Sequence, residues 1–163
     1  MIAIDSSSLI LTAKADILDK ITKCLKKKLA LTEEVYKEST SKIDADDAKV
    51  IKKRVEEKIL LKKEIKNTAL YRKIREDFNL GKGEAEAVVF CMENSTSLIT
   101  DDKKAMNACR ILRIKFTTAP NLLVMLYKKK RIKKEEADLS LKKFEKFGRY
   151  TEDVLQRVKE DLK

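Results

Sequence analysis

Histidine and tryptophan are both absent from this sequence of 163 residues. Without histidine, the chain can form neither a Ser-His-Asp nor a Cys-His nucleophilic site, nor a zinc site that needs imidazole. General-base or metal chemistry must therefore use carboxylate, lysine, tyrosine or cysteine side chains. Aromatic residues make up only 6% of the chain, so the sequence shows no stacking platform for single-stranded bases.

Cysteine is also sparse, with only Cys24, Cys91 and Cys109. An odd and scattered set does not form a disulfide framework, and no Cys-x-x-Cys pair is present for metal or redox chemistry. Free thiols favour a reducing compartment, so we expect a cytoplasmic protein. The first residues lack the basic flank and apolar stretch of a signal peptide, and no apolar run approaches the length of a membrane span. We therefore expect no membrane association.

Charge is what the sequence has in excess. Charged residues make up 40% of the chain, and 38 basic residues against 27 acidic ones give a net charge of +11. A basic chain favours a polyanionic partner, and nucleic acid is the first candidate because lysines near phosphates gain from counterion release. A solvated lysine-rich surface explains the charge equally well. The 43% of apolar residues suffices for one core, and we expect a single domain over residues 1–163.

Short apolar runs alternate with longer segments of helical period. Strands are expected at residues 1–5, 28–31, 59–61, 97–100 and 114–117. Helices are expected at residues 7–13, 15–27, 44–57, 67–78, 84–93, 102–112, 121–129, 133–146 and 151–162, and after a cap at Thr32. This alternation predicts an α/β fold with a mostly parallel central sheet and helices on both faces.

Acidic residues stand at or soon after the ends of the expected strands: Asp5, Glu38, Glu84, Asp101 and Asp102. Any one of them is explained by helix capping or by a surface ion pair. The set is more informative than any single acid. Ligands bind at the carboxyl ends of parallel strands, and carboxylates crowded there repel one another. A divalent cation relieves that repulsion, and oxygen ligands select Mg²⁺ or Mn²⁺. The pattern therefore predicts metal-dependent phosphodiester cleavage.

Four motifs give the chain a resemblance to a known family. They lie at residues 4–10 (Ile-Asp-Ser-Ser-Ser-Leu-Ile), 31–38 (ending in Glu38), 80–88 (with Gly-Glu-Ala-Glu-Ala) and 98–105 (with Thr-Asp-Asp). In this order and spacing the sequence resembles PIN-domain ribonucleases, particularly the archaeal and bacterial branch related to VapC-type toxins. The resemblance implies a three-layer α/β/α PIN-like fold with a core over about residues 1–130. Extra C-terminal helices would then occupy about residues 131–163.

The same resemblance implies the roles of particular residues. The catalytic, metal-binding acids would be Asp5, Glu38, Glu84 and Asp102, with Asp101 as a further metal ligand. Hydroxyls that orient an acid or a water would be those of Ser7 and Thr100. Candidate contacts to nucleic acid are Lys82 and Lys103, which adjoin the third and fourth acids in the sequence.

The expected function is that of an endonuclease on single-stranded RNA that depends on Mg²⁺ or Mn²⁺. The resemblance also implies a possible toxin role with a protein antitoxin as partner. A housekeeping RNA-processing nuclease is an alternative, and so is a catalytically silent PIN-like module that binds RNA or a protein. The four acids favour the enzyme, although the third motif carries Glu84 where Asp is commoner. The C-terminal extension suggests a homodimer or partner surface formed by Leu139, Leu141, Phe144 and Phe147.

Overall fold

The computed structural model describes residues 1–163 and is built around a five-stranded sheet. All neighbouring strands are parallel, in the order β3-β2-β1-β4-β5. The strands are β1 (Ile2–Ile4), β2 (Leu29–Thr32), β3 (Leu60–Lys63), β4 (Leu98–Ile99) and β5 (Phe116–Thr117). Parallel strands are covered on both faces, which is why these strands are short apolar runs rather than alternating patterns. The α/β fold with a parallel sheet is confirmed.

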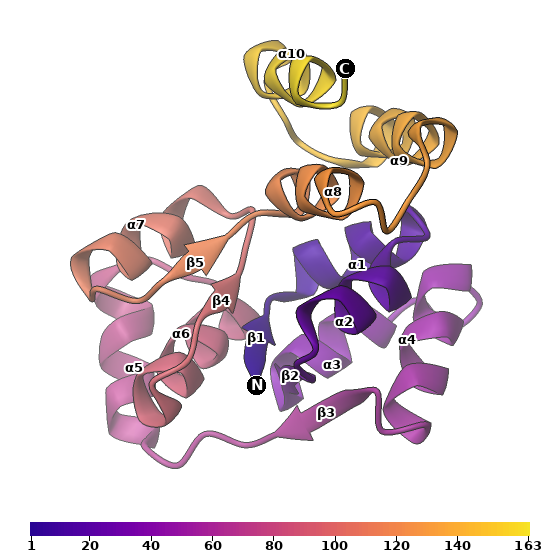
Figure 1. The fold of residues 1–163 in the computed structure, drawn as a ribbon. Coiled ribbons are helices and arrows are strands. Elements are labelled where there is room, and N and C mark those ends of the chain that lie inside the picture. The colour runs from indigo at the N-terminus through magenta and orange to yellow at the C-terminus, as the bar shows by residue number, and fades with distance from the viewer.

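Helices flank the sheet on both sides (Figure 1). They are α1 (Ser6–Lys14), α2 (Leu18–Leu25), α3 (Glu33–Thr40), α4 (Asp46–Glu56), α5 (Thr68–Asp77), α6 (Lys82–Asn94), α7 (Lys103–Ile111), α8 (Ala119–Lys128), α9 (Lys134–Phe147) and α10 (Glu152–Asp161). Each expected helix is present, with shifted ends. In the third motif, α6 begins at Lys82, so Gly83 lies inside the helix rather than before it.

The order of the strands places a crevice beside β1. The chain builds β2 and β3 on one side of β1 and then returns to build β4 and β5 on the other. Connections therefore leave in opposite directions from the carboxyl ends of β1 and β4, and such a switch point is where ligands bind in open parallel sheets. Because Ile4 is in register with Ile99, Asp5 and Thr100 follow side by side at this edge.

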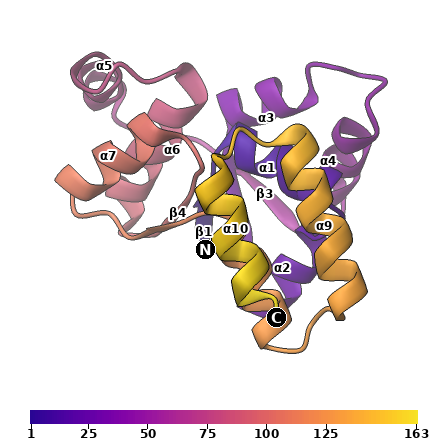
Figure 2. The same cartoon turned by 90° about the horizontal axis from the view of Figure 1, so that it is seen from above.

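The C-terminal helices are part of the same packed structure. Helices α8, α9 and α10 stack together at the top of Figure 1, and α9 and α10 lie side by side when seen from above (Figure 2). One continuous cluster of 38 buried apolar residues includes Leu141 and Phe144. The expectation that these two side chains are free for a partner is therefore wrong. Only Leu139 and Phe147 of that set stay exposed, at 59% and 46%.

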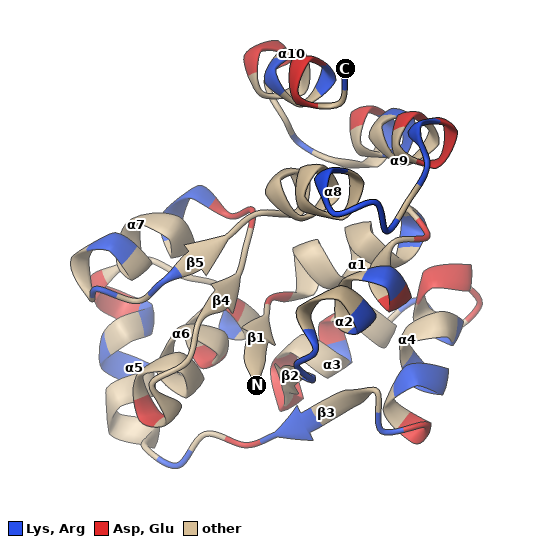
Figure 3. Ribbon diagram, viewed as in Figure 1, with Lys and Arg blue, Asp and Glu red and all other residues tan.

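Basic residues are spread over most elements (Figure 3). They are densest in the link between α8 and α9, where residues 128–134 carry six Lys or Arg. None of the ten helices is both long enough and apolar enough to cross a lipid bilayer.

Candidate functional site

Asp5 connects the end of β1 to the start of α1 and is completely buried. Its Oδ1 accepts hydrogen bonds from the backbone N–H of Ser8 at 2.8 Å and the hydroxyl of Ser7 at 3.1 Å, and its Oδ2 accepts one from the hydroxyl of Thr100. Burial raises the pKa of Asp5 to about 6, and the charge of Asp101 adds to the rise, although the bonds from Thr100 and Ser8 oppose it. One carboxylate thus caps a helix and lies at the edge of the sheet.

Three consecutive serines in the first turn of α1 bind three different acids. The bonds run from Ser6 to Glu38 at 2.5 Å, from Ser7 to Asp5 at 3.1 Å and from Ser8 to Asp101 at 2.8 Å. Successive helical residues point about 100° apart, so a serine run can serve acids that come from three directions. Of the three, only Ser7 was predicted from the sequence, because the rotation of the helix decides what Ser6 and Ser8 face.

Glu38 in α3 lies against the first turn of α6. Its Oε1 accepts a hydrogen bond from the backbone N–H of Gly83 at 3.1 Å. A Cβ at position 83 would stand only 2.5 Å from Oε2 of the same carboxylate. A side chain at position 83 would push the end of Glu38 away, so glycine lets this carboxylate lie against the first turn of α6. Gly83 therefore helps to place Glu38, whereas the sequence pattern indicated only a break in the chain there.

Glu84 and Asp102 begin neighbouring helices beside Glu38. The pKa of Glu84 is raised, first by partial burial and then by the negative charges of Glu38 and Asp102. Asp102 caps α7, since its Oδ1 accepts from the backbone N–H of Ala105 at 2.8 Å. Its own N–H donates to Oγ1 of Thr100 at 3.2 Å, so Thr100 links Asp102 to Asp5.

Asp101 is held by groups from two distant parts of the chain. Ser8 donates to its Oδ2, and the backbone N–H of Ala119 at the start of α8 donates to its Oδ1 at 3.2 Å. Burial raises the pKa of Asp101. The hydroxyl of Tyr150 is buried without a hydrogen-bond partner, and burial together with the nearby charge of Asp101 raises its pKa. Nothing in the sequence pattern connects Tyr150 with residue 101, so this tyrosine was not predicted to lie at the site.

Part of this acidic cluster opens into a cleft of about 360 Å³. Its polar lining includes Ser7, Glu84, Asp101 and Asp102, whereas Asp5 and Glu38 do not line it. The remaining lining comes from α1, from Phe147 at the end of α9 and from residues 148–150, which lie between α9 and α10. The cleft therefore combines acids from the sheet edge with a segment of the C-terminal extension.

The donor set suits a hard divalent cation, because every acidic ligand offered is a carboxylate oxygen. The raised pKa of Glu84 also reflects carboxylates close enough to repel one another. As the side chains stand, however, no group of three acidic or thiol side chains converges closely enough to hold one ion. Glu38 and Glu84 have the longest acidic side chains in the set, so they are the acids best able to rotate toward a shared ligand.

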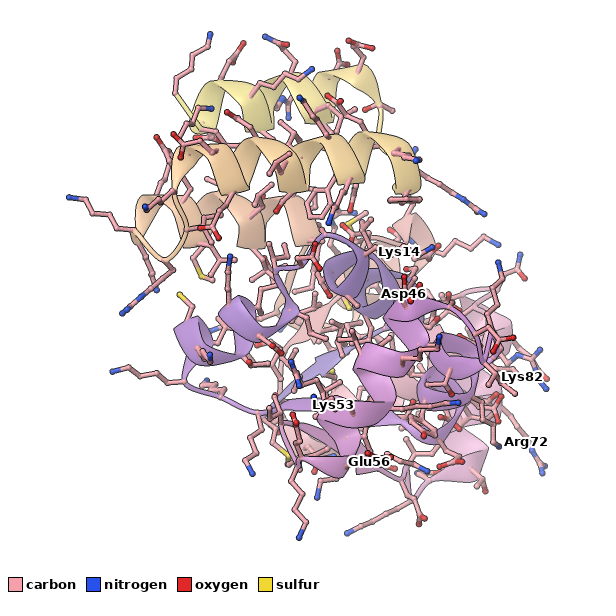
Figure 4. The ribbon with its side chains drawn as sticks, turned by 90° about the vertical axis from the view of Figure 1, so that its right-hand side faces the viewer. Lys14, Asp46, Lys53, Glu56, Arg72 and Lys82 are labelled. Atoms are coloured by element: carbon pink, nitrogen blue, oxygen red, sulfur yellow. The ribbon has the colours of Figure 1, made fainter.

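The two lysines expected beside the site are both exposed. Lys82 lies in the first turn of α6 and is separated from Glu84 by one residue in the sequence. Lys103 lies in the first turn of α7 and directly follows Asp102. Figure 4 shows Lys82 at the surface on the same side as Lys14. Neither Lys82 nor Lys103 forms an ion pair.

Comparisons with known proteins agree with this architecture. The model of family DUF3368, described as a PIN domain, matches residues 1–163. The crystal structure of PAE2754 from Pyrobaculum aerophilum is similar, with a TM-score of 0.56 and 17% sequence identity over 76% of this chain and 87% of that one. At that identity the likeness supports the fold alone. No match was found among the curated proteins.

Proposed function

The chain belongs to the PIN-domain family, and from that premise we propose that it is a ribonuclease that depends on Mg²⁺ or Mn²⁺ and cuts within single-stranded RNA. The observation that carries the proposal is the gathering of acids from four elements at the switch point of the sheet. Glu84, Asp101 and Asp102 line the cleft, and burial raises the pKa of the first two. Such perturbed carboxylates in a cleft are typical of a working site.

The proposed roles follow from the contacts of each residue. Asp102, Asp101 and Glu84 would hold the divalent ion together with Asp5 and Glu38. When bound, this ion supplies a Lewis acid for the phosphate and lowers the pKa of an attacking water.

The hydroxyls keep those acids in place. Ser7 and Thr100 hold the carboxylate of Asp5, and Ser6 with the N–H of Gly83 holds that of Glu38. The exposed lysines Lys82 and Lys103 would attract the phosphates of the substrate.

The direct test is incubation of the purified protein with end-labelled single-stranded RNA in Mn²⁺, in Mg²⁺ and in EDTA. We expect internal cleavage with either metal and none in EDTA. Glu84→Gln should abolish cleavage. Glu56→Gln should not, because Glu56 is exposed on α4, forms no ion pair and lies outside the cleft (Figure 4). Cleavage that persists in EDTA or in Glu84→Gln would contradict the proposal.

One observation favours a second candidate, a PIN-like module that binds RNA without cutting it. No three carboxylates converge in the structure, and a silent module has no need for them to do so. The same experiment separates the two candidates, since the module would shift the RNA in a binding assay but leave it intact with every metal. A toxin role with an antitoxin, and a homodimer, stay predictions of the sequence.

A further inference from the structure

The cleft has a cationic part that the sequence motifs do not account for. Lys14, at the end of α1, and Arg149, between α9 and α10, both line it together with Glu84 and Asp102. The structure has ten ion pairs, and neither Lys14 nor Arg149 takes part in any of them. Two positive charges thus face a cleft that also holds acids, without being neutralised by them.

Other cations near Lys14 and Arg149 do have acidic partners. On the same part of the molecule, Lys143 pairs with Asp16, and Lys159 pairs with Glu145 at 2.9 Å. Acidic partners are therefore available to cations on this surface. Lys14 and Arg149 keep free donors toward the cleft, and these donors suit an anionic ligand.

Packing against an aromatic ring restricts where Lys14 lies. The ammonium of Lys14 lies over the ring of Phe147, 4.9 Å from its centroid, so the end of α9 positions a residue of α1. Figure 4 shows Lys14 directly beneath the C-terminal helices. A cation held over an aromatic ring has fewer side-chain conformations to lose when it binds a ligand.

The backbone beside Arg149 is held just as firmly. The N–H of Gly148 bonds to the carbonyl oxygen of Phe144 at 2.8 Å, and the rings of Phe144 and Tyr150 pack with centroids 5.9 Å apart. A Cβ at position 148 would stand 2.5 Å from Cε2 of Tyr150. Gly148 therefore permits the fold-back that places Arg149 at the cleft, between two anchored neighbours.

We infer that Arg149 and Lys14 bind a backbone phosphate of the single-stranded RNA next to the one that is cut, so that the C-terminal extension is a wall of the substrate site. The inference rests on the proposed function. Arginine offers a planar fork that matches two phosphate oxygens, and lysine adds a point charge. A cleft of about 360 Å³ with acids in one part and free cations in another suits a phosphodiester chain better than it suits an uncharged ligand.

The test measures binding without cleavage. A short fluorescent single-stranded oligonucleotide, fully 2′-O-methylated so that its 2′-hydroxyls cannot attack, is titrated in EDTA and followed by anisotropy. We expect Arg149→Ala to weaken binding by about tenfold and to lower the slope of log K against log salt by about 0.7, the value for one phosphate contact. Lys14→Ala should weaken binding less, and Arg149→Lys should restore part of the affinity.

The matched control is Arg157→Ala. Arg157 is an exposed arginine of α10 that forms no ion pair and does not line the cleft. Arg157→Ala removes the same charge from the same extension as Arg149→Ala does. We therefore expect it to weaken RNA binding at most about twofold, through the loss of long-range attraction. Equal losses of RNA affinity in Arg149→Ala and Arg157→Ala would overturn the inference. Competition for the site by polyglutamate that is as strong as competition by RNA of equal charge would also overturn it.

Failure of the inference can be told apart from failure of the proposed function. A wild-type protein that binds the oligonucleotide through Arg149 but cuts RNA in neither Mn²⁺ nor Mg²⁺ would contradict the nuclease and keep the phosphate contact. A wild-type protein that cuts RNA while Arg149→Ala retains its KM and its affinity would do the opposite. If Arg149 only neutralises the acids, Arg149→Ala will change thermal stability at neutral pH and leave RNA binding unchanged, which overturns the inference.

Discussion

At the scale of single residues, Asp5 links the stability of the protein to pH. Its pKa is raised from 3.8 to about 6 by burial, whereas in the unfolded chain it has its ordinary value. The folded state therefore binds this proton more tightly. The contribution of protonated Asp5 to stability is full below about pH 4 and is lost as the pH rises through about 6.

Asp5→Asn should remove that loss, because the amide is neutral and its oxygen still accepts from Ser8. Without metal at neutral pH, we expect the variant to be more stable than the wild type by on the order of 2 kcal/mol. The difference should vanish near pH 4. Thermal melts in EDTA at both pH values measure it. Identical melts at neutral pH would show that burial of this carboxylate has no energetic cost.

Gly83 allows a second prediction at this scale. Gly83→Ala adds a methyl group where the carboxylate of Glu38 lies, and that flexible side chain can move away. Alanine is also favoured over glycine inside a helix by about 1 kcal/mol, so the melting temperature should not fall. Activity and Mn²⁺ affinity should fall by about 10- to 100-fold. Calorimetric titration with Mn²⁺ tests this, and an unchanged affinity would mean that Glu38 is not a ligand.

The acids were accessible from the sequence because each follows a recognisable strand or begins a recognisable helix. Their partners were not. Whether Ser6 or Ser8 reaches an acid depends on the rotation of α1 relative to α3 and β4, which no local pattern encodes. Tyr150 is still harder to predict, since it meets Asp101 only after the C-terminal helices have packed against α1 and α8.

At the scale of elements, apolar runs and helical period predicted every strand and helix, and the errors lie at their ends. Helix α2 begins at Leu18 rather than at residue 15, because Asp16 takes a left-handed backbone with φ of 58°. Helix α6 begins earlier than expected because Gly81 serves as its N-cap. An apolar helix face predicts burial but does not tell whether the same chain or a partner covers it, which is why Leu141 and Phe144 were misassigned.

The extension should therefore behave as part of the core. Phe144 is fully buried in it, and Phe144→Ala should lower the free energy of unfolding by about 3 to 5 kcal/mol. Leu139→Ala on the same helix should change it by no more than about 0.5 kcal/mol, because Leu139 is exposed. Urea unfolding of both variants gives the comparison. Equal and small effects would mean that α9 and α10 dock only loosely.

At the scale of the whole molecule, net charge and local charge have opposite signs. The chain carries +11 overall, yet its carboxylates gather at the carboxyl edge of the sheet. A basic exterior increases the local concentration of a polyanion, and the acids then require a cation before a phosphate can approach them. The ion pairs on the surface are mostly exposed and add little to stability, so most of the basic excess remains available for binding.

The same electrostatics predict that divalent metal stabilises the fold. An ion that binds only the native state at about 100 times its Kd adds about 2.7 kcal/mol. For a chain of this length, that corresponds to a rise in melting temperature of about 5 to 10 °C. Mn²⁺ and Mg²⁺ at millimolar concentration should produce this shift in the wild type and in Glu56→Gln. Asp102→Asn and Glu84→Gln should lose most of it, because each removes a negative charge from the cleft. A wild-type melting temperature that does not respond to either metal would show that the acids repel one another without serving as a metal site, whatever cleavage assays report.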